Sequence, residues 1–161
     1  LSSRVIVDKT PLNFQYIGRL ARMFPSAKFV NCIREPMDNC FSIFKLPFGD
    51  SQSYAHSLPS LGQYYRRYEH LMAGWQQQFP GRVYACEYEA TVADLETQAK
   101  HLLDFIGLEF EAEVLDFHAS KRLVRTPSAS QVRQPIYQSS VAAWKRYSEQ
   151  LAPLKQALGL S

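Results

Sequence analysis

Short apolar runs alternate with helical stretches along most of this chain, and this alternation constrains the fold more than any other feature. Three runs have the length and composition of strands, at residues 4–7, 28–34 and 83–88. The middle run is almost continuously apolar, as in a parallel strand that is covered on both faces. Strands that alternate with helices predict an α/β protein with a parallel sheet, whose ligands bind at the carboxyl ends of the strands.

Helices are predicted where apolar residues recur at helical spacing. The predicted segments are 12–24, ending before Pro25, a helix that starts near Pro36, then 60–78, 95–106 with Gly107 as its C-terminal cap, and 141–158. Three strands are few for such a sheet, so we expect it to be incomplete on its N-terminal side, with an exposed edge. Because the chain opens on Leu1 within a few residues of a strand, we expect a single domain over residues 1–161 that is the C-terminal portion of a longer one.

Composition excludes several classes of protein. Of the 161 residues, 46% are hydrophobic and 20% charged, which is typical of one soluble globular domain. A net charge of +3 is too small for a nucleic-acid binder, and no apolar run approaches the roughly 18 residues of a membrane span. The three cysteines are odd in number and lie in apolar segments, which favours buried free thiols and the cytoplasm. The four histidines share no metal-like spacing, so no metal site is predicted.

The segment from Ile33 to Ser42 has the features of an anion site. It is a strand that ends in Arg34 and turns into a helix carrying Asp38 and Ser42 on one face. A guanidinium fork, free N–H groups at a helix start and a hydroxyl all suit phosphate oxygens. The same residues also fit a purely structural interpretation, in which Arg34 pairs with Asp38 or Glu35 at the helix start.

This segment resembles the R-x-P-x-D-x-x-x-S motif of sulfotransferases that use 3′-phosphoadenosine 5′-phosphosulfate (PAPS). Three further segments follow in that family's order, at residues 8–11, 87–89 and 126–135, the last leading to Trp144. The pattern is most similar to bacterial sulfotransferases associated with tetratricopeptide repeats, which are similar to tyrosylprotein sulfotransferases. The resemblance implies a three-layer fold of the P-loop nucleoside-kinase type and sulfuryl transfer from PAPS to a hydroxyl, on tyrosine or on another protein or small-molecule acceptor.

The resemblance also implies roles for single residues. Arg34 and Ser42 would hold the 3′-phosphate, and Tyr88 would contact the adenosine. Lys9 would act in catalysis by offsetting charge on the leaving oxygen, and Thr10 would bond the leaving phosphate. Two simpler interpretations stay open from the residues alone: Lys9 as a surface lysine paired to its neighbouring aspartate, and Tyr88 as a core residue.

The polar loop at 126–135 would complete the cofactor site. Ser128 matches a catalytic-site serine near the phosphosulfate, and Arg133 adds a cationic fork that would reach the nucleotide. Ala142 and Ala143 stand where the family usually has a glycine and a basic residue, and the two cations at 145 and 146 are the candidates to compensate.

Two parts of the family's machinery have no counterpart in the sequence. Pro11 follows Lys9 and Thr10 where small-molecule sulfotransferases carry a histidine base, and no Gly-rich loop is present to cradle the 5′-phosphosulfate. We therefore expect the base and the loop upstream of Leu1, and the chain alone to be inactive. The alternative is a non-catalytic module that binds adenine nucleotides or a protein, with a homodimer through the exposed edge as one form of it.

Overall fold

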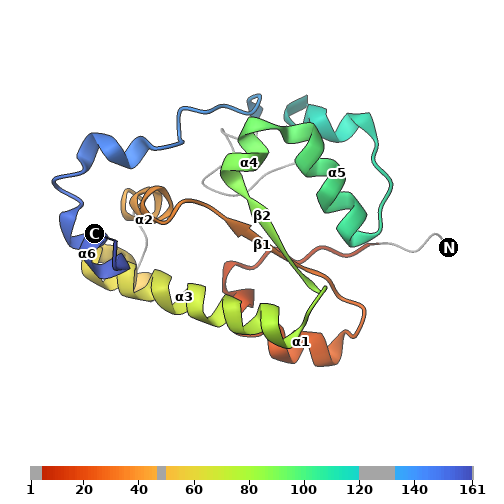
Figure 1. Ribbon diagram of the computed structural model, residues 1–161, viewed down its shortest axis with the longest axis horizontal. Coiled ribbons are helices and arrows are strands. Elements are labelled where there is room, and N and C mark those ends of the chain that lie inside the picture. The colour runs from red at the N-terminus through yellow and green to blue at the C-terminus, as the bar shows by residue number, and fades with distance from the viewer. Residues whose placement is uncertain (1–4, 47–49, 120–132, 161) are drawn as a thin grey trace.

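The computed structural model describes residues 5–46, 50–119 and 133–160, and within them two parallel strands form the centre of an α/β fold (Figure 1). Strand β1 spans Phe29–Ile33 and β2 spans Val83–Glu87, and the two are paired without offset from Phe29 opposite Val83 to Ile33 opposite Glu87. The α/β class and the parallel pairing are confirmed. The complete three-layer sheet that the resemblance implies lies beyond what these residues show.

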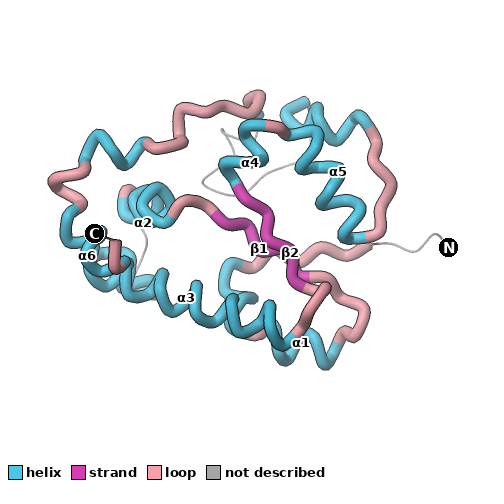
Figure 2. The backbone as a smooth tube through the Cα atoms, in the orientation of Figure 1, coloured by secondary structure: helices cyan, strands magenta, loops and turns pink. Residues whose placement is uncertain are grey.

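Helices make up most of the remaining described chain, as the tube in Figure 2 shows. The α-helices are α1 Ile17–Met23, α2 Pro36–Phe44, α3 Leu58–Gln78, α4 Tyr88–Ala93, α5 Leu95–Ile106 and α6 Ala152–Leu158. Short 3-10 helices span Pro11–Gln15, Asp50–His56, Ala112–Ala119 and Ala143–Tyr147.

Local chemistry fixes the ends of the predicted helices. Pro36 occupies the first turn of α2, where a missing N–H costs nothing, as the sequence predicts. The Asp94 carboxylate accepts the Thr97 N–H at 3.1 Å and caps the start of α5. Gly107 ends α5 with φ of 78°, a conformation that favours glycine.

Helices contact both faces of the small sheet. From α3, the Tyr68 hydroxyl donates to Asn31 Oδ1 at 2.8 Å, while on β2 the Tyr84 ring stacks on Phe105 of α5 with centroids 5.1 Å apart. Since side chains alternate along strands, Asn31 and Tyr84 point to opposite faces in this register. The two strands are therefore held between α3 and α5.

The main core lies beside the sheet, where α2, α3 and α6 meet. Its buried members are Met37, Cys40, Phe41, Leu61, Tyr65, Leu151, Leu154 and Leu158. A Cβ on Gly62 would lie 2.7 Å from the Ala157 Cβ, so only glycine lets α3 and α6 approach this closely. This packing holds the C-terminal helix α6 against α3.

Three expectations from the sequence are wrong. Residues 5–7 form no strand: they have no partner among the described residues, and the Ile6 side chain is 92% exposed. The predicted helix 141–158 is broken before Ala152, because Pro153 offers no N–H and must lie in a first turn. Tyr88 starts α4 rather than ending β2, and this short helix was not predicted.

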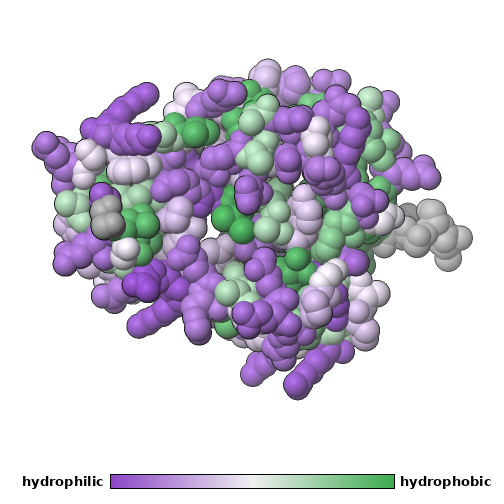
Figure 3. Space-filling model, viewed as in Figure 1, coloured by the Kyte–Doolittle hydropathy of each residue, from purple (hydrophilic) through white to green (hydrophobic). Residues whose placement is uncertain are grey.

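The cysteines depart in part from the prediction of buried thiols. Cys40 is fully buried and Cys86 is half-buried, but Cys32 is exposed. Figure 3 shows apolar side chains reaching the surface over the middle of the face, where the strands lie. No helix in the described ranges has the length and hydropathy to cross a membrane.

Candidate functional site

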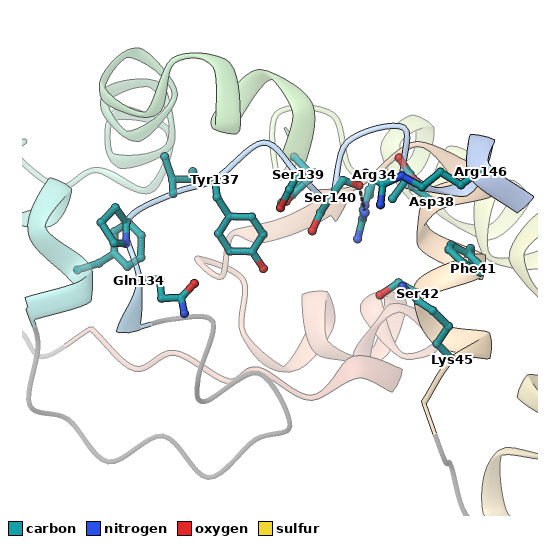
Figure 4. A pocket seen from close by; sticks show the side chains of 15 residues that line it. Arg34, Asp38, Phe41, Ser42, Lys45, Gln134, Tyr137, Ser139, Ser140 and Arg146 are labelled. Atoms are coloured by element: carbon teal, nitrogen blue, oxygen red, sulfur yellow. Dashed lines mark hydrogen bonds between the residues drawn. The ribbon is translucent and has the colours of Figure 1, made fainter.

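A pocket of about 430 Å³ lies where β1 ends and α2 begins (Figure 4). One wall runs along α2 from Asp38 to Lys45, the residue after its end, and another is formed by the segment from Gln134 to Arg146. The lining residues are Arg34, Asp38, Phe41, Ser42, Lys45, Tyr88, Phe117, Gln134, Pro135, Ile136, Tyr137, Ser139, Ser140, Ala143 and Arg146. Three of the residues predicted from the sequence, Arg34, Ser42 and Tyr88, are therefore brought together.

The Arg34 guanidinium is only partly satisfied by the protein. Its Nη2 donates to the Ser140 carbonyl at 2.5 Å, and its carbon lies 4.9 Å from the centroid of the Tyr88 ring. Its Nε is buried and has no hydrogen-bond partner among the described residues. A buried N–H of a charged group without an acceptor is costly, so this atom indicates a place for an added acceptor such as an anion oxygen.

The two acids beside Arg34 are engaged elsewhere. Asp38 is 1% exposed, and its carboxylate accepts the backbone N–H groups of Ala142 at 2.6 Å and Trp144 at 2.9 Å. A carboxylate oxygen of Glu35 accepts the Asp38 N–H at 2.7 Å. The structural interpretation, in which Arg34 pairs with one of these acids, is therefore wrong for this geometry.

The pocket is electropositive. Figure 4 shows Ser42 of α2 and Lys45, the residue after its end, facing the segment that carries Ser139, Ser140 and Arg146. Of the described lining residues, Arg34, Lys45 and Arg146 are cationic and Asp38 alone carries a carboxylate, which its two N–H donors already bind. Such a lining favours an anionic ligand.

Two pocket residues show what sequence reasoning missed. Lys45 follows Ser42 by one helical turn, a spacing that local periodicity could have revealed. The Ser140 carbonyl carries no sequence signal, since it lies 106 residues from the arginine that it contacts. Arg146 lines the pocket, whereas Lys145, its companion candidate for compensation, is not among the lining residues.

Lys9 and Thr10 lie in a different and larger cleft of about 940 Å³, which is also lined by β1, a strand that pairs only with β2 among the described residues. The Asp8 carboxylate accepts the Thr10 hydroxyl at 2.8 Å and the Asn13 amide at 3.1 Å, so its contacts are with these two residues rather than with Lys9. Partial loss of solvation raises the pKa of the Cys32 thiol, and the nearby Lys9 cation opposes this rise. The structure thus separates these two residues from the Arg34 pocket but places both sets along β1.

The remaining predicted residues are placed as follows. Tyr88 is half-buried with its ring beneath Arg34, so it is a pocket residue rather than a core tyrosine. Arg133 is exposed and next to Gln134, which lines the pocket, but it is not itself among the lining residues. Ser128 lies outside the described residues.

A family model described as "Sulfotransferase family" matches residues 2–112, and the chain belongs to the sulfotransferase family. It is therefore related to enzymes that transfer sulfuryl groups. The chain is also similar to an uncharacterized protein of Aquifex aeolicus (strain VF5), with 35% identity over 156 residues. That alignment covers 95% of this chain and 20% of the relative, so the chain spans about a fifth of that protein's length.

Proposed function

We propose that this chain supplies the 3′-phosphate half of the cofactor site of a PAPS-dependent sulfotransferase. One observation carries the proposal: in a chain of the sulfotransferase family, Arg34 lines an electropositive pocket at the carboxyl end of a parallel strand, and its buried Nε has no acceptor among the described residues. Ligands of parallel α/β sheets bind at that end of the strands.

The residues present fit a phosphate monoester on a ribose. In the proposed complex, a phosphate oxygen accepts the Arg34 Nε–H while Nη2 keeps its bond to Ser140. The Ser42 hydroxyl donates a further bond, and the Lys45 and Arg146 cations balance the remaining charge. The Tyr88 ring packs against the Arg34 guanidinium, and its edge would contact the adenosine.

Sulfuryl transfer would take place between this pocket and the cleft that holds Lys9. The acceptor oxygen bonds to sulfur, the bond from sulfur to the bridging oxygen breaks, and adenosine 3′,5′-bisphosphate leaves. Lys9 would offset the charge on that oxygen, Thr10 would bond the leaving 5′-phosphate, and Ser128 would lie near the phosphosulfate before transfer. Lys9 lies near Cys32, and Arg34 follows Cys32 by two residues, which span about 6.6 Å of strand.

The rest of the enzyme belongs to the same proposal. The complete three-layer sheet, the Gly-rich loop and the base that takes the acceptor's proton would come from upstream of Leu1, because Pro11 cannot act as a base. Arg133 would approach the nucleotide from the exposed end of its loop. The acceptor is a hydroxyl compound, and the free cysteines support the cytoplasm as its compartment.

The test compares two nucleotides by calorimetric titration of the full-length protein. A sulfotransferase site should prefer adenosine 3′,5′-bisphosphate over ADP, because only the first carries a phosphate for Arg34. A kinase-like site would bind ADP equally well or better, and this result would contradict the proposal. Release of the bisphosphate from PAPS in the presence of phenol, tyrosine-peptide and carbohydrate acceptors then tests turnover.

A second candidate, an association module, is favoured by the edge of β1. Among the described residues β1 pairs only with β2, and the exposed apolar residues 5–7 lie near its free edge. A free edge beside an apolar cleft is suited to pairing with another strand, including one from a second copy of the chain. Light scattering across a concentration series tests this candidate, and a constant monomer mass would contradict the homodimer.

A further inference from the structure

We propose that Cys32 and Cys86 form a reversible intramolecular disulfide that links β1 to β2. This inference concerns a modification site, and it does not depend on the function proposed above. Its basis is the position of the two thiols in the sheet.

The register places the two cysteines directly opposite each other on neighbouring parallel strands. Opposed residues of a parallel pair point to the same face, and adjacent strands lie about 4.8 Å apart. Disulfides form between residues whose Cα atoms are about 4.4–6.8 Å apart, so the backbone already has a suitable spacing. The two thiols are also close enough to interact: loss of solvation raises the pKa of Cys32, and the Cys86 thiol raises it further.

The three cysteines differ in access to solvent. Cys32 is exposed and lines the larger cleft, where a small oxidant can reach it. Cys86 is half-buried, and its sulfur lies 3.8 Å from the Thr91 hydroxyl. Cys40 is completely buried in the core, and burial raises its pKa to about 12, so it serves as an unreactive internal control.

The chemistry needs a disulfide oxidant, for which oxidised glutathione is suitable. The Cys32 thiolate attacks one glutathione sulfur and releases the other glutathione as a thiolate. The Cys86 thiolate then attacks the Cys32 sulfur and releases the second glutathione. In total, the two cysteines lose two protons and two electrons, and one oxidised glutathione becomes two reduced molecules.

The position of the bond ties it to the pocket described above. Arg34 follows Cys32 by two residues and Tyr88 follows Cys86 by two, and these two side chains contact each other. A bond between the cysteines would therefore link the strands just before the pair that lines the pocket. Reduction by added thiols would restore the two free cysteines.

Peptide mapping after oxidation tests the proposal, because trypsin places the three cysteines on separate peptides, 29–34, 35–45 and 83–100. The full-length protein is treated with oxidised glutathione at mildly alkaline pH, which compensates for the raised pKa of Cys32, then acid-quenched, alkylated and digested. We expect peptide 29–34 joined to 83–100, with a mass lower by two hydrogen atoms than their sum, and separation of the two on reduction.

Two variants control the assignment. In Cys86→Ser, the reaction should stop at the mixed disulfide between Cys32 and glutathione, since no second thiol can resolve it. Cys32→Ser should form neither this mixed disulfide nor the link between the strands. Circular dichroism checks that each variant is folded. Wild-type protein that keeps glutathione on Cys32, links different molecules, or leaves both thiols free would overturn the proposal.

Discussion

The Asp38 carboxylate and the Ala142 backbone are joined by a 2.6 Å hydrogen bond across 104 residues of chain. The other carboxylate oxygen accepts the Trp144 N–H at 2.9 Å. These two bonds hold the C-terminal segment against α2, and they bring the Ser140 carbonyl to Arg34. A buried acid thus builds one wall of the pocket without contacting the arginine.

Replacing Asp38 by asparagine should destabilise the protein. The amide has one acceptor oxygen where two N–H groups need one each, so a buried donor is left unpaired, at a cost of about 2–3 kcal/mol. Urea unfolding measures the change. Asp104→Asn, on the exposed side of α5, is the matched control, and equal destabilisation by both variants would contradict the role of Asp38.

Ala142 is the one described non-glycine residue with positive φ, at 57°. Glycine adopts this conformation without the steric cost that alanine pays, so Ala142→Gly should stabilise the protein by about 0.5–1 kcal/mol. Ala143→Gly is the matched control, because Ala143 begins a right-handed 3-10 helix and its replacement should destabilise by a similar amount. Urea midpoints that move in the same direction would refute this explanation.

Local patterns predict much of the fold. The helix start near Pro36, the long helix predicted over 60–78 and the helix end at Gly107 follow from local residue patterns, and these predictions are confirmed, with the long helix beginning two residues earlier at Leu58. The strand expected at 4–7 is not formed by its described residues, 5–7, because a strand needs a neighbour, and composition does not say whether one is present.

The candidate site was only partly predictable for a similar reason. Arg34 and Ser42 share one local motif, so their proximity follows from helix geometry. The other wall of the pocket comes from residues more than 100 positions further along the chain. It supplies the N–H groups that bind Asp38, the Ser140 carbonyl and Arg146, and no local spacing specifies such contacts. The resemblance places a glycine at position 142, and the positive φ of Ala142 gives the physical reason for it, but the sequence alone does not show this φ.

Tyr88 should contribute to nucleotide binding through its ring. Its centroid lies 4.9 Å from the Arg34 guanidinium, and contacts of this kind are worth about 0.5–1 kcal/mol or more when desolvated. Tyr88→Leu should weaken binding of adenosine 3′,5′-bisphosphate by this amount, whereas Tyr88→Phe keeps the ring and should bind normally. Equal losses in both variants, measured by titration calorimetry, would assign the effect to the hydroxyl instead.

Acid should weaken the cap at the start of α5. Hydrogen bonds from Thr97 hold the pKa of Asp94 below its ordinary value of 3.8. A carboxyl with a lower pKa in the folded state adds stability above pH 3.8, and this contribution is lost as pH falls through the folded pKa.

Asp94→Asn tests this dependence, because asparagine also caps helices but does not titrate. The difference in urea midpoint between wild type and variant should be constant near neutral pH and should shift against the wild type below pH 3.8. Parallel stability profiles across this range would show that the Asp94 charge contributes nothing to the cap.

The proposed contact between Arg34 and the 3′-phosphate of the nucleotide is tested by a titration cycle. Wild-type and Arg34→Ala full-length proteins are each titrated with adenosine 3′,5′-bisphosphate and with adenosine 5′-monophosphate, which lacks only the 3′-phosphate. Arg22→Ala, an exposed arginine on α1, is the control for loss of charge. We predict that Arg34→Ala weakens bisphosphate binding by about 1.5–3 kcal/mol and leaves monophosphate binding unchanged. Equal losses for both nucleotides, or none for either, would show that Arg34 does not bind the 3′-phosphate.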